Sequence, residues 1–244
     1  MRTWISLIVL LSIATTPFLN AQRWWGGGVD GKGPRVEKDL QIDHFDGIRL
    51  TISADVYLTP GRSQSVRVSA QQNIIDLLET DVDGGVWKID TEENLDDHSK
   101  IKIYITVPEM TYVKLSGSGN IYTEGTFDNA GNTVEVGVSG SGNLEFNTNA
   151  RSIEAGISGS GDIELDGSAD DVSVGISGSG DVDAMGMTAQ NCEVRVSGSG
   201  NVKVHATQQL NVRVSGSGDV YYRGNPNVQS RISGSGDLES VSGR

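Results

Sequence analysis

Seven Asn or Asp side chains recur in the same short context and form the most regular set of polar groups in the chain. Each directly follows a Ser-Gly-Ser-Gly stretch, and in order they are Asn120, Asn143, Asp162, Asp181, Asn201, Asp219 and Asp237. If these positions stack at the spacing of β-strands, neighbouring carboxylates repel each other unless they are solvated, offset or bridged by a cation. A cation ladder is therefore one hypothesis, with four acidic ligands: Asp162, Asp181, Asp219 and Asp237.

Calcium is the cation that such a ladder would hold, as it is held between the coils of repeats-in-toxin proteins. The alternative is an Asx turn, in which each side chain caps its own corner and Asn and Asp serve equally. Three of the seven positions are Asn, and the acidic residue follows Gly directly. These two observations favour the Asx turn, so we expect no cofactor and keep calcium as the alternative.

Other residues that could carry chemistry are scattered. The three histidines, His44, His98 and His205, lie far apart in the sequence and lack metal-ligand spacing. The Gly-Ser-Gly triplets are followed by strand-forming residues, whereas a phosphate-binding loop needs a helix after it. The sequence therefore names no catalytic and no cofactor-binding residue, and it predicts a protein that is not an enzyme.

Three smaller features have both a functional and a structural interpretation. The acidic stretch 92–97 is predicted to be a solvated loop, with a cation site or a contact to a basic partner as the alternative. Trp24 and Trp25 could stack on a sugar or a protein, or pack on the end of the domain. Cys192 is the single cysteine, which excludes an intramolecular disulfide and predicts a small core residue.

The elements that position these residues come from a repeat. Copies of Ser-Gly-Ser-Gly begin at Ser116, Ser139, Ser158, Ser177, Ser197, Ser215 and Ser233, in steps of 23, 19, 19, 20, 18 and 18 residues. The residue before each copy and the residue after each Asn or Asp are always aliphatic. A flexible linker has no reason to keep such a period, so the sequence indicates a repeat architecture.

One unit, residues 171–188, shows what the repeat builds. Val172, Val174 and Ile176 alternate with small or polar residues, and the alternation resumes at Val182 after the corner. Two strands joined by this corner, with a second corner near Gly186, cannot bury their apolar face alone. Stacking successive units gives an all-β fold, a right-handed parallel β-helix (β-solenoid) with about 18–20 residues per coil.

The corner glycines follow from that stacking. A sharp turn in a stack tolerates little side-chain bulk and often needs a positive φ, which glycine adopts without penalty. The predicted structural corners are Gly117, Gly119, Gly140, Gly142, Gly159, Gly161, Gly178, Gly180, Gly198, Gly200, Gly216, Gly218, Gly234 and Gly236.

The first half of the chain is less regular. Short strands are predicted at 48–52, 56–59, 65–70, 86–90 and 101–107, and residues 73–79 form a predicted short helix capped by Asn73. When Asp55 is aligned with Asp219, the flanking residues also correspond. This alignment predicts a degenerate copy of the repeat within the first half.

Composition and the N-terminus set further bounds. The 244 residues carry a formal net charge of −13, which argues against nucleic acid and anionic membranes as partners. Hydrophobic residues make up 36% and aromatic residues 6%, a balance that favours an elongated fold with a thin core. Residues 1–21 have a basic start, a short apolar run and a small residue at position 21, as in a signal peptide. Residues 22–39 are predicted to be a flexible leader.

The segments Phe45-Asp46-Gly47-Ile48, Ser53-Ala54-Asp55-Val56-Tyr57-Leu58 and Leu77-Leu78-Glu79-Thr80, followed by the repeats, resemble the family called putative auto-transporter adhesin, head GIN domain. The resemblance implies one such domain over residues 40–240, with degenerate coils at 40–112 and regular Ser-Gly-Ser-Gly repeats at 113–240. It also implies an exported bacterial protein of a kind frequent in Bacteroidetes. It brings no catalytic residues with it.

These observations predict a non-enzymatic adhesin or binding scaffold in the periplasm or on the surface of a Gram-negative bacterium. Its expected partners are a surface glycan or protein, without nucleic acid and without a membrane span after signal cleavage. Two alternatives stay open: an envelope carbohydrate-active or polysaccharide-binding protein, and a structural protein that forms homo-oligomers through its coil ends.

Overall fold

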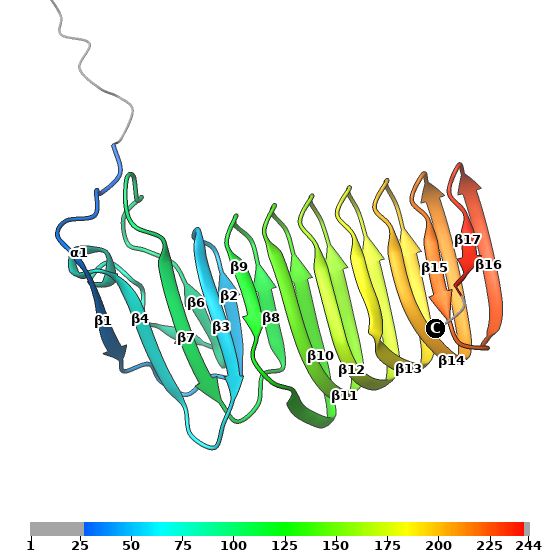
Figure 1. Cartoon of the computed structure of the whole chain (residues 1–244), viewed down its shortest axis with the longest axis horizontal. Helices are drawn as coiled ribbons and strands as arrows, with labels where there is room; N and C mark the ends of the chain where they lie inside the picture. Colours follow the sequence, from blue (N-terminus) through cyan, green and yellow to red (C-terminus); the bar gives the residue numbers. More distant parts are fainter. Residues whose placement is uncertain (1–26, 242–244) are drawn as a thin grey trace, which may run out of the picture.

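The computed structural model describes residues 27–241 of the chain. These residues form a long stack of narrow coils, with the N-terminal part at one end and the C-terminal part at the other (Figure 1). The predicted signal peptide at 1–21 and the Trp24-Trp25 pair lie outside the described residues.

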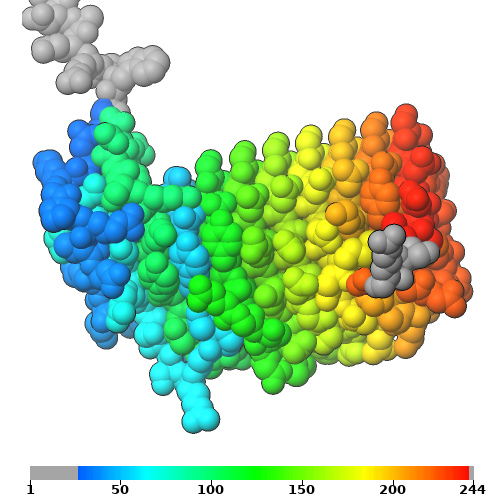
Figure 2. All heavy atoms as spheres, viewed as in Figure 1, coloured from blue at the N-terminus to red at the C-terminus, as the bar shows by residue number. Residues whose placement is uncertain are grey.

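The repeats form a parallel β-solenoid, as predicted. Each coil has a first arm that leaves the Ser-Gly-Ser-Gly corner and a second arm that returns to the next one. The corners all lie along one edge of the stack, where they form an even row of projections (Figures 1 and 2). The strands of this part are β8 (Tyr112–Leu115), β9 (Asn120–Thr123), β10 (Phe127–Val138), β11 (Asn143–Ile157), β12 (Ile163–Ile176), β13 (Val182–Val196), β14 (Val202–Gly216), β15 (Val220–Arg223), β16 (Asn227–Gly234) and β17 (Leu238–Ser240).

Strands β11 to β14 each run through the opposite corner without a break, so one strand forms both arms of a coil. The second corner predicted near Gly186 falls inside β13, where the register with β12 shifts. Along both arms the strands pair in parallel with their copies in the neighbouring coils. Side chains therefore stack in columns that run along the solenoid.

Inward columns make up the core. The aliphatic residue before each corner is buried in six coils, at Leu115, Val138, Ile157, Ile176, Val196 and Val214, whereas Ile232 in the last coil is 38% exposed. Cys192 stands in another inward column between Val172 and Leu210 and is 2% exposed. Burial raises the pKa of its thiol to about 12, which confirms the prediction of a structural core residue.

Close backbone packing explains the corner glycines. A Cβ added at any of the fourteen positions would come within 3.0 Å of a backbone carbonyl oxygen in the neighbouring coil. At Gly198, for example, that oxygen belongs to Gly178. Positive φ is the smaller cause: of these corner glycines only Gly216 and Gly234 have it, at 155° and 137°. The expected lack of space is therefore general, while the expected left-handed backbone is confined to the last two corners.

The N-terminal part contains a coil that lies out of sequence order. Strands β2 (Gly47–Leu50) and β3 (Ala54–Pro60) form its arms, and Asp55 pairs with Asn120 while Val56 pairs with Ile121. This register confirms the predicted degenerate copy. On its other side the coil pairs with β6 (Val86–Ile89) and β7 (Ile101–Val107), so the chain passes through the second coil before the first (Figure 1).

The remaining N-terminal strands cap the stack. Strand β4 (Ser65–Gln71) pairs antiparallel with β7, and β1 (Arg35–Leu40) pairs antiparallel with β4. A two-residue strand, β5 (Val82–Asp83), pairs antiparallel with β6. The prediction of a flexible leader is wrong for residues 35–39, because β1 supplies hydrogen bonds to the edge of β4. Residues 40–112 were predicted to form degenerate coils throughout. Only part of this segment does so, because β4 pairs antiparallel with β7 at the end of the stack.

The short helix α1 (Gln72–Ile75) is shorter than predicted. Its N-cap residue is Gln71, which makes no capping hydrogen bond with its side chain. Asn73 does not cap the helix: its Nδ2 donates to the carbonyl oxygen of Asp30 at 2.9 Å, and its Oδ1 accepts from the backbone N–H of Lys32 at 2.8 Å. Its role is therefore to fasten the segment that precedes β1.

Candidate functional site

A groove of about 870 Å³ runs along the outer face of the second arms. Its centre is the outward position two residues before each corner. In consecutive coils this column reads Lys114, Gly137, Gly156, Gly175, Arg195, Arg213 and Arg231. Three glycines thus leave a floor without side chains between a lysine at one end and an arginine ladder at the other.

The floor glycines differ from those at the corners because nothing inside the molecule requires them. A Cβ added at Gly156 or Gly175 would have no atom within 4 Å. At Gly137 the nearest atom would be a carbon of the flexible Lys114 side chain, at 3.3 Å. Glycine lowers the stability of a strand interior and often marks a place where a ligand approaches the backbone.

Polar side chains form the two rims of the groove. On the corner side stands a row of exposed serines: Ser139, Ser158, Ser177, Ser197, Ser215 and Ser233. On the other side Glu135 and Glu154 are paired in register, and the same column continues through Ser173 to Glu193. The groove therefore offers hydroxyl groups along one rim and carboxylate acceptors along the other.

Ion pairs fix both ends of the floor. Lys114 Nζ forms a salt bridge with Glu135 Oε1, and this hydrogen bond raises the pKa of the lysine. Glu193 Oε1 accepts from Arg195 Nη2 at 2.5 Å and from Arg213 Nη1 at 2.8 Å. One carboxylate thus serves two arginines, whose side chains are 55% and 61% exposed. Within residues 27–241 no salt bridge involves Arg231.

This groove was not predicted from the sequence, although its signal is present in the repeats. Aligning them on the residue two positions before Ser-Gly-Ser-Gly shows Lys, then Gly three times, then Arg three times. The alternation marks that position as outward-facing, so glycine there has no packing reason. Only the parallel register shows that the three glycines are contiguous in space.

The predicted Asn/Asp ladder exists as a chain of hydrogen bonds between coils. Asp162 Oδ1 accepts from the backbone N–H of Asp181 at 2.9 Å, and Asp181 Oδ1 accepts from that of Asn201 at 2.6 Å. Asn201 Oδ1 accepts in the same way from the backbone N–H of Asp219 at 3.0 Å. Asp219 Oδ1 accepts from the backbone N–H of Asp237 at 2.9 Å. Each of these four side chains thus caps the next coil, where an Asx turn was expected to cap its own corner.

An acidic column flanks that ladder on the outer face of the first arms. Glu145, Glu164 and Asp183 pair in register, and they line a shallow hollow with Asp162 and Asp181. Burial, followed by repulsion from Glu145, raises the pKa of Glu164. Among residues 27–241, no group of three or more His, Cys, Asp or Glu side chains has a geometry that could hold a metal ion.

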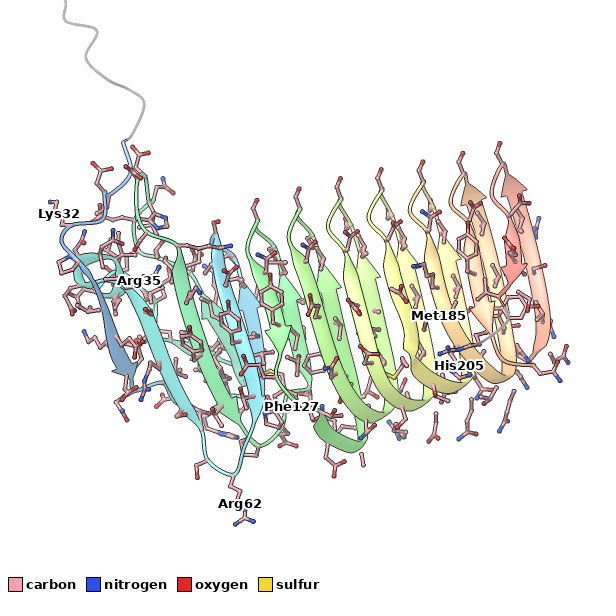
Figure 3. All side chains as sticks on the ribbon, viewed as in Figure 1. Lys32, Arg35, Arg62, Phe127, Met185 and His205 are labelled. Carbon is pink, nitrogen blue, oxygen red and sulfur yellow. The ribbon has the colours of Figure 1, made fainter. Side chains whose placement is uncertain are left out.

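The remaining sequence candidates lie apart from the groove. His44 is exposed in a loop, and His98 Nδ1 lies 2.9 Å from the carbonyl oxygen of Ser99. His205, labelled in Figure 3, lies in β14 beside Thr188, and burial and Arg223 lower its pKa. The acidic stretch 92–97 is a mostly exposed loop whose backbone pairs with residues 29–31.

Three tyrosines form a second conspicuous surface feature. Tyr57 stacks on Tyr104 at 5.1 Å and on Tyr122 at 5.5 Å between ring centroids, on the outer face of the first arms. The ring of Tyr57 is stacked between the other two, so it does not present a free face to another ring. The groove is therefore the better candidate for a binding site.

Comparison with protein families identifies the chain. The family described as putative auto-transporter adhesin, head GIN domain, matches residues 44–226. The chain belongs to this family. The match covers the out-of-order coil, most of the groove and most of the repeats. No curated protein matches the chain.

Solved structures show the same fold. A putative adhesin from Bacteroides fragilis aligns with a TM-score of 0.81 at 21% identity, over 88% of this chain and 100% of that one. A putative lipid binding protein from Parabacteroides distasonis aligns with a TM-score of 0.72 at 26% identity, over 87% and 99%. A putative adhesin from Parabacteroides distasonis aligns with a TM-score of 0.69 at 28% identity, over 87% and 99%. Within residues 27–241 of the present chain, no helix is long and apolar enough to cross a membrane.

Proposed function

We propose that this member of the head GIN domain family is a non-enzymatic, exported binding module of the cell envelope, and that the groove is its contact surface. The observation that carries the proposal is the glycine floor. Gly156 and Gly175 keep an otherwise regular sheet face open although the fold does not need them. A binding partner that approaches the backbone supplies the missing reason.

The rigidity of the groove supports a binding role. Its floor and its acidic rim belong to strands that pair with both neighbours over most of their length, and most of the serines of the other rim directly follow the ends of these strands. A rigid, preformed surface binds without the cost of ordering loops. The rows of serines and charged groups repeat from coil to coil, so a partner with repeated groups would make several contacts at once.

The state of the charged groups supports a role without catalysis. Lys114 is held protonated by Glu135, which makes it a poor general base. Glu193 is occupied by two arginines. These contacts hold Lys114 and Glu193 in fixed positions that suit recognition of a partner.

One observation favours the alternative of a carbohydrate-active protein. Glu135 and Glu154 are direct neighbours on adjacent strands, and two carboxylates about 5 Å apart are the arrangement of retaining glycosidases. Incubation with envelope polysaccharides and assay of released reducing ends decides between the two functions. We expect no release; release that disappears in Glu154→Gln would replace the binding proposal with catalysis.

Binding itself is tested with the full exported chain on an array of glycans and envelope proteins. The variant Gly156→Trp fills the floor from a position where a side chain has open space. We expect it to lose binding while its thermal unfolding stays close to that of the wild type. The matched control is Ser168→Trp, which places the same ring at an exposed site on the opposite corner. Equal binding by both variants would contradict the proposal.

A further inference from the structure

We propose that the groove binds an acidic glycan, in which a sugar ring that carries a carboxylate lies on the floor formed by Gly156 and Gly175. Its carboxylate then pairs with Arg195 at the end of the floor. This inference rests on the proposed function and names the chemistry of its ligand.

The arginine ladder is the first argument. Arg195, Arg213 and Arg231 are directly opposite one another on neighbouring strands, an arrangement in which like charges repel. Glu193 is the only carboxylate that pairs with them within residues 27–241. A ligand that brings carboxylates would offset the repulsion that remains. Guanidinium groups are well suited to this because they bind carboxylates through two parallel hydrogen bonds.

The position of the ladder beside the floor is the second argument. Gly175 and Arg195 are direct neighbours in the register of β12 and β13. A sugar ring that rests one face on the glycines therefore places a substituent at its edge next to the Arg195 guanidinium. An extended peptide fits less well, because its side chains alternate in direction and would hold its backbone away from the floor.

The rims supply the third argument. A sugar ring carries hydroxyl groups around its whole edge, and each can donate and accept hydrogen bonds. Ser158 and Ser177 lie on one side of the floor, and Glu154 lies on the other. The groove therefore surrounds a ring with the partners that hydroxyl groups need, in addition to the arginine that a carboxylate needs.

The repeat of the coils sets the direction of a longer ligand. Adjacent strands are about 4.8 Å apart, which is close to the advance per sugar in an extended polysaccharide. A chain that runs along the solenoid would thus keep successive sugars in step with successive coils. An acidic group two units away from the first would then reach Arg231, about 9.6 Å from Arg195.

The overall charge of the protein narrows the ligand further. With a net charge of −13, the protein as a whole repels polyanions. Charges more than about 8 Å away are screened at physiological salt, so the arginines dominate at short range. A glycan with well-separated carboxylates can use that local field, whereas a nucleic acid carries a phosphate at every unit and would bring some of them beside Glu135 and Glu154.

Titration calorimetry with two matched sugars tests the inference. The probes are a hexasaccharide of hyaluronan, which carries a glucuronate in every second unit, and the same hexasaccharide with its carboxylates reduced to alcohols. A sialylated oligosaccharide serves as a third probe, because it presents the carboxylate on a terminal ring. We expect the reduced sugar to bind at least about tenfold more weakly than its acidic parent. Preference for the sialylated probe would assign the site to a terminal acidic sugar, in keeping with the inference.

Variants of the arginine ladder test whether it is the part of the groove that binds the carboxylate. The double variant Arg195→Gln/Arg213→Gln should bind the acidic sugar at least about tenfold more weakly than the wild type and bind the reduced sugar with unchanged affinity. The control is Arg151→Gln, which removes an exposed arginine of β11 outside the groove. Because all three arginines are exposed, these variants should unfold at the same temperature as the wild type.

The outcomes separate the two proposals. If both sugars bind equally well and Gly156→Trp abolishes both, the groove is a binding site but the acidic ligand is wrong. If no sugar binds while Gly156→Trp abolishes binding to another array ligand, the inference fails and the proposed function stands. If Gly156→Trp leaves all binding intact, both are wrong.

Discussion

The corner glycines and the floor glycines of the groove carry the same side chain in opposite surroundings. At Gly198 an added Cβ would collide with the carbonyl oxygen of Gly178, whereas at Gly175 it would meet no atom within 4 Å. The corners are closed by the neighbouring coil and the floor is open to solvent. Glycine is thus required by the fold at one site and left unexplained by the fold at the other.

This difference separates stability from recognition within a single coil. Residues 175–180 contain a floor glycine, Gly175, and two corner glycines, Gly178 and Gly180. Only the corner pair is needed to stack the coils. Substitutions a few residues apart should therefore affect different properties of the protein.

The largest effect is expected from Gly198→Val. Its branched side chain cannot fit against the backbone of Gly178, so the corner must shift and the pairing of adjacent coils is disturbed. We expect the free energy of unfolding to fall by about 3 kcal/mol, measured by denaturant unfolding.

Gly175→Val is the matched control for that variant. Its side chain points into open space, and a β-branched residue suits a strand better than glycine does. We expect unchanged stability or a gain of up to about 1 kcal/mol, together with loss of ligand binding. Equal destabilisation by both variants would remove the distinction between the two regions.

The next effect in size is expected at the buried residue Cys192. Cys192→Ser places a hydroxyl in a buried apolar column, and we expect a loss of about 2 kcal/mol. The wild-type thiol gives an independent measurement. Because its pKa is raised to about 12, it should resist alkylation at pH 8 until the protein unfolds. Rapid alkylation of the folded protein would contradict the assignment of Cys192 to the core.

The Asn/Asp ladder should contribute less per residue. Asp181→Ala removes the acceptor for the backbone N–H of Asn201, and we expect a loss of about 1 kcal/mol. Asp181→Asn keeps an acceptor and should cost less than half of that. If the ladder instead holds calcium, Asp181→Asn should resemble Asp181→Ala, and added calcium should raise the unfolding temperature of the wild type only.

The smallest effect, and one of opposite sign, is expected at the acidic column. The folded state raises the pKa of Glu164 above 4.5, so the ionised side chain destabilises the fold at neutral pH. Glu164→Gln should therefore raise the free energy of unfolding at pH 7 by about 0.3 kcal/mol. The gain should fall as the pH drops through the raised pKa and vanish well below pH 4.5, where the wild-type side chain is protonated in both states. A gain that persists at pH 3 would point to a cause other than charge.

Much of the solenoid could be predicted because its physical causes are local and repeated. Alternating aliphatic residues on both sides of each Ser-Gly-Ser-Gly stretch defined the arms, and the constant step defined the coil. The alignment of Asp55 with the Asn/Asp positions was also correct. The order of the N-terminal coils could not be predicted, because β2 and β3 pair with strands on both sides and the spacing along the chain does not say which neighbour lies on which side.

The sequence by itself determined the coil, its corners and the burial of Cys192, since each depends on residue type and on a spacing that repeats along the chain. The tertiary structure alone decided that the Asn/Asp side chains cap the next coil, because that contact joins residues about one repeat apart. It also decided that Gly137, Gly156 and Gly175 form one floor beside Arg195. Residues that recur once per coil come into contact only when the coils stack in register. The groove is formed by such contacts between coils, so it does not exist within any single repeat.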